Sequence, residues 1–136
     1  MDVNSQNRKP WRMLLPLAAV LVLAGLWSAY WYVAAGLART ELQRQRARLA
    51  AQGLEIGCAS EDWGGYPFRF EFACTSPVLA ASRHELSAAS LRAYAQAYYP
   101  WHVLLLVDGP TRLQPLAGAP LVASHETLRA SIRFRD

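Results

Sequence analysis

Five side chains in the sequence are of the types that bind transition metals, and their spacing argues against a metal centre. They are Cys58, Cys74, His84, His102 and His125. A structural zinc site takes its ligands in close pairs, about two to four residues apart, and no two of these five are that close. We therefore expect no metal and no cofactor, and we expect the two cysteines to form a disulfide.

Two His-Glu pairs resemble the start of a zinc-protease motif but lack its second half. That motif needs another histidine four residues after the first, and the sequence has Ala88 after His84 and Arg129 after His125. A Gly-x-Ser-x-Gly nucleophile turn and a phosphate-binding loop are also missing from the sequence. We assign no catalytic residue and expect a protein that is not an enzyme; an envelope enzyme using Glu61 or His102 is the third hypothesis.

The two cysteines lie on two predicted strands. Apolar side chains alternate with others over residues 54–58 and again over 66–74, and the segment 61–65 between them is rich in turn-forming residues. An antiparallel hairpin of these strands can place Cys58 opposite Cys74 at the Cα separation that a disulfide needs. The second strand carries Phe68, Phe70, Phe72 and Cys74 on one face and Arg69 and Glu71 on the other.

The phenylalanine strand also supplies the candidate contact residues. Phe68 and Phe72 are expected in the protein core, but a curled, open sheet would make them part of an apolar trough together with Val103, Leu105 and Val107. Arg69 and Glu71 are expected to form a solvated ion pair worth about 0 to 1 kcal/mol. The alternative is that Arg69 binds a lipid phosphate or a partner carboxylate.

The positive charge is confined to the first third of the chain. Residues 1–48 carry seven basic and two acidic side chains, whereas residues 49–136 carry seven basic and eight acidic ones. A nucleic-acid-binding domain needs a basic surface, so the nearly neutral second part argues against nucleic acid as a partner.

The basic residues of the first part flank an uncharged apolar segment. No charged residue occurs from Met13 to Ala38, and this length exceeds the roughly 20 apolar residues that cross a bilayer. Trp27, Tyr30, Trp31 and Tyr32 lie near its end, where aromatic side chains favour the headgroup level. We expect an uncleaved membrane anchor; cleavage after the small residues 33–35 is the alternative.

The topology follows from the flanking charges and the cysteines. Arg8, Lys9 and Arg12 precede the apolar segment and favour the cytoplasmic side, and a disulfide requires an oxidising compartment on the other side. We therefore expect a single-pass protein with four parts, namely a cytoplasmic tail (1–12), a transmembrane signal anchor (13–35), a helical stalk (36–53) and an exported β-rich domain (54–136).

The stalk and the rest of the exported domain are less clearly patterned. We expect the stalk to be a solvated spacer that ends at Gly53. Alanine-rich residues 82–99 favour a helix by propensity, although they also alternate. Short strands are expected at 102–107, 113–116, 121–124 and 128–134, which suggests an antiparallel meander. The fold class is thus an N-terminal helix followed by a mainly antiparallel β domain, or an α+β domain with a helix at 82–99.

Several motifs resemble an uncharacterised proteobacterial family catalogued as domain of unknown function 2125. They are Gly64-Gly65-Tyr66-Pro67-Phe68-Arg69-Phe70 with its flanking cysteines, residues 95–103 and residues 128–131. The resemblance implies an inner-membrane anchor, a periplasmic β-rich domain and strands rather than a helix at 82–99. Members of the family are longer, so the chain resembles their N-terminal part. The Gly-Tyr-Pro-Phe-Arg pattern is also similar to repeats in membrane-anchored β proteins linked to envelope lipid handling.

Two functions follow from these features. The first is a membrane-anchored, envelope-associated protein that contacts lipid acyl chains and supports the envelope structure. The second is an adapter that docks another envelope protein through an exposed strand edge, because the last predicted strand, 128–134, ends close to Asp136 and its edge needs a covering partner. The expected partners are thus the lipid bilayer and either lipid or a second envelope protein.

Overall fold

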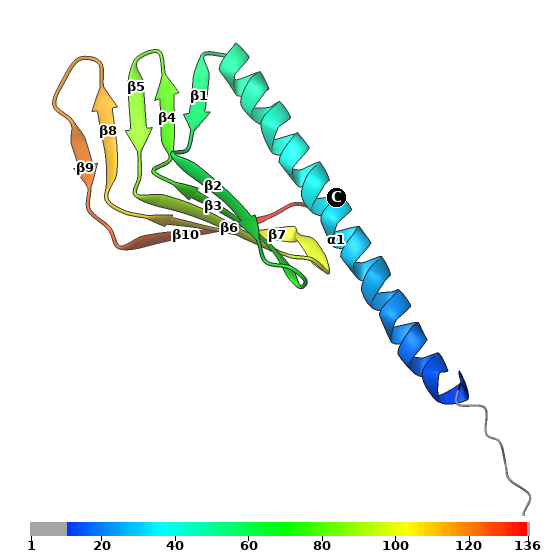
Figure 1. The fold of residues 1–136 in the computed structure, drawn as a ribbon. Helices are drawn as coiled ribbons and strands as arrows, with labels where there is room; N and C mark the ends of the chain where they lie inside the picture. Colours follow the sequence, from blue (N-terminus) through cyan, green and yellow to red (C-terminus); the bar gives the residue numbers. More distant parts are fainter. Residues whose placement is uncertain (1–10, 136) are drawn as a thin grey trace, which may run out of the picture.

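One long helix is followed by ten short strands in the computed structural model, which describes residues 11–135 (Figure 1). The helix α1 extends from Trp11 to Ala51. The strands are β1 (Leu54–Gly57), β2 (Ser60–Gly64), β3 (Arg69–Thr75), β4 (Val78–Ala81), β5 (His84–Ser87), β6 (Ser90–Gln96), β7 (Tyr99–Asp108), β8 (Thr111–Pro115), β9 (Leu121–Ala123) and β10 (Thr127–Arg133). Arg8 and Lys9, to which we assign a role in topology, lie outside the described residues, and Arg12 lies in the first turns of α1.

The helix α1 joins the predicted anchor and the predicted stalk without a break. Strong helix formers continue the apolar segment up to Ala51. Gly53 then adopts a φ of 82°, and its N–H donates to Ala50 O at 3.0 Å. A residue without a Cβ enters this left-handed conformation at little cost, so the predicted C-terminal end of the helix is confirmed.

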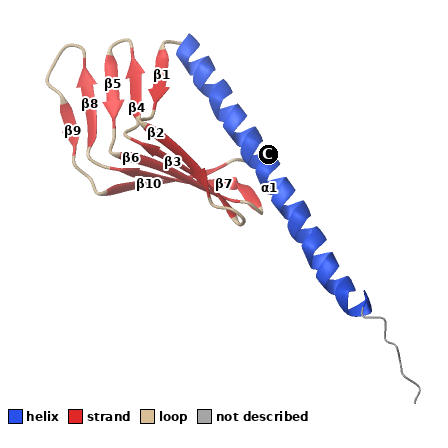
Figure 2. Ribbon diagram, viewed as in Figure 1, coloured by secondary structure: helices blue, strands red, loops and turns tan. Residues whose placement is uncertain are grey.

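The strands form two antiparallel sheets of five strands each (Figure 2). Sheet A has the order β1-β4-β5-β8-β9, and sheet B has the order β10-β7-β6-β3-β2. Backbone hydrogen bonds continue from one sheet to the other, for example from Ser76 N to Ala89 O and from Gly109 N to Glu126 O. The two sheets are therefore the halves of one antiparallel meander whose five long strands each bend once.

The bends occur where the backbone cannot continue a regular ladder. Ser76 has a φ of 49° and precedes Pro77, which has no N–H to donate. Gly109 and Pro110 make the bend between β7 and β8, and residues 124–126 separate β9 from β10. Turn-forming residues thus divide each strand between the two sheets.

The expected turn at 61–65 is wrong in its position. Ser60–Gly64 is the strand β2, which pairs with β3 through Trp63 opposite Phe72. The turn lies at residues 65–68, where Gly65 has a φ of 94° and a Cβ on it would stand 2.5 Å from Arg69 O. The glycines mark a turn correctly, but pairing with β3 extends the strand through the charged residues before them.

The expected helix over residues 82–99 is also wrong, because this segment contains β5 and β6. Leu91, Ala93 and Ala95 alternate along β6 and face the same side as their partners on β3 and β7. Alanine favours a helix only by tenths of a kcal/mol per residue, whereas two flanking strands satisfy every ladder position of β6. The strands implied by the family resemblance are confirmed here.

Sheet B has an apolar inner face and a polar outer face. Residues directly opposite each other on neighbouring strands share a face. The register gives inner rows that cross the sheet, namely Trp63, Phe72, Ala93, Leu105 and Ala130, then Phe70, Ala95, Val103 and Ile132, then Glu61, Cys74, Leu91, Val107 and Leu128. Glu61 is the one charged member of these rows. The opposite face carries Asp62, Arg69, Glu71, Arg92, Gln96, His102 and Arg129.

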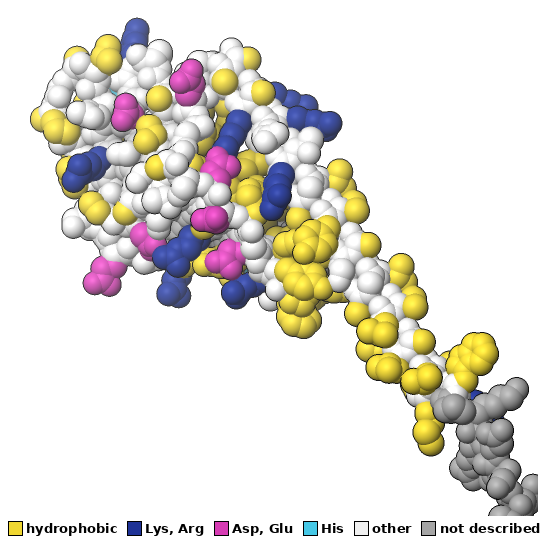
Figure 3. All heavy atoms as spheres, in the orientation of Figure 1, with side chains coloured by type: hydrophobic (Ala, Val, Ile, Leu, Met, Phe, Trp, Pro, Cys, Tyr) yellow, Lys and Arg dark blue, Asp and Glu magenta, His cyan; other side chains and the backbone are white. Residues whose placement is uncertain are grey.

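The second half of α1 lies against the sheets and is not the solvated spacer that we expect. It contacts β1, and Arg46 on this half forms an ion pair with Glu61 of β2. The first half projects beyond both sheets with its apolar side chains exposed (Figures 1 and 3). The same helix is therefore partly a cover of the β domain and partly a free apolar rod.

Asp108, at the bend between β7 and β8, connects three strands of sheet B. Its carboxylate accepts hydrogen bonds from Ser90 at 2.7 Å, from Thr127 at 2.9 Å and from Arg92 at 2.9 Å. These donors, Ser90 first and then Thr127 and Arg92, favour the ionised form and lower the pKa of Asp108. The cluster holds the edge strand β10 to the sheet.

Replacing Asp108 should make stability depend less on pH. A carboxyl whose pKa is lower in the folded state stabilises the fold above the ordinary aspartate pKa of about 4, and this contribution disappears as the pH falls through the lowered value. Thermal unfolding of the wild type and Asp108→Asn should therefore differ near neutral pH and converge under acid conditions. Asp62→Asn, at an exposed outer position, is the control and should follow the wild type throughout. A gap of constant size at all pH values would contradict this role.

Candidate functional site

An apolar groove lies between the second half of α1 and the inner face of sheet B. Its volume is about 520 Å³. The helix contributes Tyr30, Ala34, Ala38, Glu41, Leu42 and Gln45, and the remainder of the chain contributes mainly Trp63, Phe70, Phe72, Ala93, Ala95, Pro100, Val103 and Phe134. The volume lies within the range of about 300 to 1,000 Å³ that is usual for small-molecule sites.

The helix side of the groove is a stripe of residues four apart. Tyr30, Ala34, Ala38 and Leu42 follow each other at this spacing, which places them on one face of α1. The two alanines leave space between the helix and the sheet, because a larger side chain at either position would fill it. The two alanines therefore line the helix side of the groove without filling it.

The sheet side of the groove comes from the inner rows of sheet B. Phe70 and Phe72 on β3 stand beside Ala95 and Ala93 on β6, so that large side chains alternate with small ones across the sheet. Trp63 on β2 packs on Phe72 with their ring centroids 4.9 Å apart. Aromatic rings thus form one wall, and the alanines form the floor.

The groove is closed near the middle of α1 by a small buried cluster. Trp31 is 5% exposed and Ala35 4%, and they pack with Ala97, Trp27 and Phe70. The Trp31 ring stacks on Phe70 at 5.5 Å between centroids, and its Nε1–H donates to Arg69 O at 3.0 Å. This cluster fixes the helix to the β domain at the border between its free half and its packed half.

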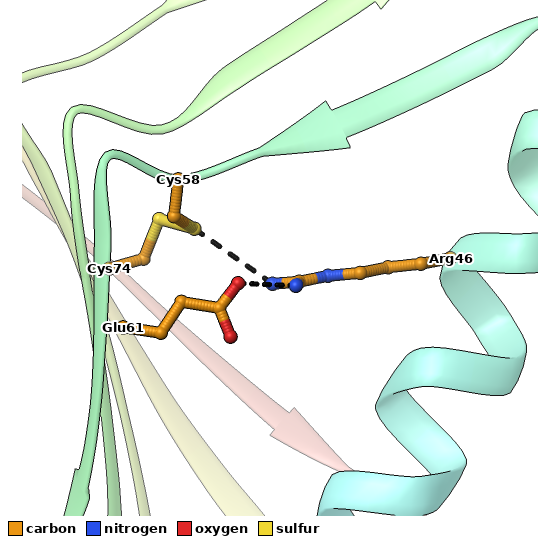
Figure 4. A network of polar contacts seen from close by, with 4 residues as sticks. All are labelled: Arg46, Cys58, Glu61 and Cys74. Atoms are coloured by element: carbon orange, nitrogen blue, oxygen red, sulfur yellow. Dashed lines mark hydrogen bonds and ion pairs between the residues drawn. A yellow bond between two sulfur atoms is a disulfide. The ribbon is translucent and has the colours of Figure 1, made fainter.

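The other end of the groove is polar and lies beside the disulfide. Figure 4 shows Arg46 reaching from α1 to Glu61 and to the Sγ of Cys58, which is 3.8 Å from its Nη2. Gln45 donates to Glu41 at 2.9 Å. The Nε of Arg46 is buried without a protein partner. A long apolar ligand would therefore meet polar groups at this end of the groove.

The structure brings together some of the candidate residues and separates others. Phe72 lines the groove together with Phe70 and Val103, so the sheet does form an apolar trough. Phe68 is not part of it, because the turn at 65–68 precedes β3 and leaves this side chain 69% exposed. Arg69 lies on the outer face, where its Nη2 is 3.4 Å from Glu71 and its guanidinium covers the Tyr94 ring.

Cys58 and Cys74 form a disulfide with their Cα atoms 5.5 Å apart. Cys58 follows β1 at the bend, and Cys74 lies on β3, where it is 1% exposed. The bond ties the bend between β1 and β2 to the end of β3, next to the bend at Ser76. It therefore links two neighbouring bends of the meander.

The histidines lie apart from the groove. His102 Nε2 is 2.7 Å from Ser131 Oγ on the outer face of sheet B, and His125 Nε2 is 3.4 Å from Thr111 Oγ1. Over residues 11–135, no three His, Cys, Asp or Glu side chains come together as a metal site. The groove itself presents shape and apolar surface rather than reactive groups.

Sequence reasoning missed the helix side of the groove. The sequence does contain the stripe of Tyr30, Ala34, Ala38 and Leu42. It is hard to recognise because most of it lies in the uncharged apolar segment, where residues on every face of the helix are apolar. Ala93 and Ala95 were hidden by the expected helix at 82–99. The signal that could have revealed both is the spacing of small residues, four apart on α1 and two apart on β6.

These features define a class of protein, a β-groove domain joined to an apolar N-terminal helix. The sequence model of a bacterial family described as "Uncharacterized protein conserved in bacteria (DUF2125)" matches residues 31–136. The chain belongs to this family, as the motifs around Gly64–Phe70 indicate. Comparisons with curated proteins and with solved structures find no match.

Removing the disulfide should destabilise the β domain. The two cysteines have a sequence separation of 16. On the chain-entropy estimate, a disulfide that closes a loop of about this length stabilises the folded state by ~3 kcal/mol. Denaturant unfolding of the detergent-solubilised chain should show a loss of this order for Cys58→Ala/Cys74→Ala. The reduced wild type should match the double variant. Equal stability of the oxidised wild type and the double variant would contradict a structural role for the bridge.

Proposed function

We propose that this chain is a single-pass inner-membrane protein of the bacterial envelope that holds a lipid acyl chain in its groove, on the periplasmic side and without catalysis. The observation that carries the proposal is the apolar groove, which begins beside the membrane anchor. An envelope-supporting role follows from a stored or bound lipid at this position.

The free half of α1 supports the membrane anchor. The helix is long and apolar enough to cross a membrane. From Met13 to Leu26 the large apolar side chains are all more than half exposed, and an apolar surface of this size is unfavourable in water. A bilayer covers this surface and leaves the β domain outside.

The buried cluster supports retention of the anchor. Cleavage after residues 33–35 would remove Trp31, which is one of the few buried side chains among the described residues. It would also remove Tyr30 and one wall of the groove. The β domain thus depends on the residues that a signal peptidase would release.

The compartment is inferred from the disulfide. A bond between Cys58 and Cys74 persists in an oxidising environment, which the periplasm provides and the cytosol does not. The basic residues before the anchor favour the cytoplasm for the N-terminus. Both arguments support a periplasmic β domain.

An acyl chain matches the chemistry of the groove better than a polar ligand does. The central wall consists of Phe70, Phe72, Val103 and alanines, which offer no hydrogen bonds from their side chains. Burial of a methylene group from water is worth about 0.8 kcal/mol, so a long chain gains affinity from length alone. The polar side chains Glu41 and Gln45 lie at one end, and the hydroxyl of Tyr30 towards the other end is already bonded to Ala97 O.

Filling the groove should abolish lipid binding. Ala93→Trp places a large ring on the groove floor, and we expect native mass spectrometry of the detergent-extracted chain to show bound lipid in the wild type and little or none in this variant. Ala73→Trp is the matched control, because Ala73 is opposite Arg92 on the outer face, and it should retain lipid. A wild type that carries no lipid under mild extraction would refute the acyl-chain proposal.

A second candidate function is an adapter, and the open edge of the meander favours it. Strands β9 and β10 each pair with one strand only among the described residues. Leu128 and Ile132 extend the inner apolar rows to this edge and are 55% and 43% exposed. An extended segment of another envelope protein could add to β10 as a further strand.

Crosslinking from the edge strand tests the adapter. A photoreactive residue in place of Arg133 on β10 should capture one specific envelope protein in cells. The same residue in place of Asp62, on β2 at the opposite edge of sheet B, should not capture it. Absence of any adduct from position 133 would remove the adapter hypothesis.

A further inference from the structure

Two loops at one end of sheet B carry exposed aromatic side chains and no charge. They are residues 65–68, between β2 and β3, and residues 97–101, which comprise the turn after β6 and the first three residues of β7. Phe68 is 69% exposed, Tyr98 68% and Trp101 58%. Exposed aromatic clusters on soluble surfaces mark interaction sites, so these loops require a partner.

The loops are held at a defined level of α1 by hydrogen bonds. Trp27 Nε1–H donates to Pro67 O at 2.9 Å, and Ser28 Oγ is 2.7 Å from Tyr66 Oη. Tyr30 Oη–H donates to Ala97 O at 3.1 Å. The loop tips are therefore fixed beside residues 27–30, where the free apolar half of the helix begins.

This level lies inside the span of the anchor. Counted from Met13, the first residue after Arg12, about 20 residues and about 30 Å of helix are needed to cross the hydrocarbon core, which ends near Tyr32. Trp27, whose side chain donates a hydrogen bond to Pro67 O, lies five residues before Tyr32. Pro67 is therefore held about 7 Å inside this end of the span, measured along the helix. A tilted helix needs more residues to cross, so tilt brings the loops deeper.

Backbone carbonyls in and next to the loops accept hydrogen bonds from groups of the protein. The carbonyls of Gly65, Pro67, Phe68, Arg69 and Ala97 each accept a hydrogen bond, three of them from the helix side chains of Trp27, Tyr30 and Trp31. Non-helical backbone at membrane depth must be satisfied by protein groups, and these carbonyls meet that requirement.

We infer that loops 65–68 and 97–101 insert into the membrane–water interface on the periplasmic side of the inner membrane, beside α1. The lipid bilayer itself is then the partner of this end of the β domain. The inference rests on the anchor in the proposed function but not on the bound acyl chain. Figure 3 shows hydrophobic side chains along the projecting half of α1 and gathered beside it where the helix reaches the β domain. The apolar surface of the anchor thus continues onto the loops.

The charges around the loops agree with an interfacial position. Arg69 and Arg133 lie at this end of sheet B, on the outer face, where headgroup phosphates would be reached. Tyrosine and tryptophan favour the same level, since one end of each ring system is apolar and the other can hydrogen-bond.

Depth-dependent quenching of a site-directed fluorophore tests this insertion. The full-length chain is reconstituted in phosphatidylethanolamine–phosphatidylglycerol vesicles after labelling Phe68→Cys or Tyr98→Cys with bimane. Quenching by spin-labelled lipids and by aqueous iodide is then compared. Leu116→Cys is the control, because Leu116 is 84% exposed and lies in the loop between β8 and β9 of sheet A. Val22→Cys, in the free half of α1, reports the anchor.

Insertion predicts strong lipid quenching and iodide protection at positions 68 and 98, and the reverse at position 116. Lipid quenching at position 22 combined with iodide quenching at 68 and 98 would overturn the inference and leave the anchor standing. Protection of 68 and 98 from both quenchers would assign the loops to a protein partner and overturn it as well. Failure of lipid quenching at position 22 would refute the anchor, and the inserted loops with it.

Discussion

The inner face of the folded meander is apolar from β2 to β10, and one helix is all that the described residues provide to cover it. A sheet normally buries such a face against a second sheet or several helices. Here α1 covers only part of this face, so few side chains are buried although more than half of the sequence is hydrophobic. The groove exists because the apolar face of the sheet is larger than the surface of the helix that covers it.

The helix α1 therefore has two physical roles along its length. Its first half is apolar on all faces and long enough to cross a membrane, and its second half carries small residues on the face that lines the groove. The junction is built from Trp27, Tyr30 and Trp31, whose rings pack on the domain while their polar atoms bond to loop carbonyls. These side chains therefore make the contact between the middle of α1 and the loops of sheet B.

The bends of the meander and the disulfide shape the rest of the molecule. Each long strand is interrupted once, and the interruptions are aligned because backbone hydrogen bonds cross the bend from strand to strand. Asp108 and the bond between Cys58 and Cys74 reinforce this line at opposite sides of sheet B. Most charges of sheet B lie on its outer face in pairs such as Arg69 with Glu71, whereas Glu61 on the inner face is paired with Arg46 of α1.

Local patterns in the sequence determined the apolar helix, most strands, the end of the helix at Gly53 and the division of β3 into an aromatic and a charged face. These depend on neighbours within a few residues, so period and turn chemistry are sufficient to predict them. Tertiary structure decided the strands at 82–99, the extension of β2 through Glu61 and Asp62, and the contact of the expected spacer with the sheets. It also decided the groove, since Ala34 and Ala93 are far apart in the chain and acquire meaning only when the helix crosses the sheet. An alanine in a sequence does not indicate a binding site by itself. The space beside its small side chain becomes a groove only when a second surface lies opposite.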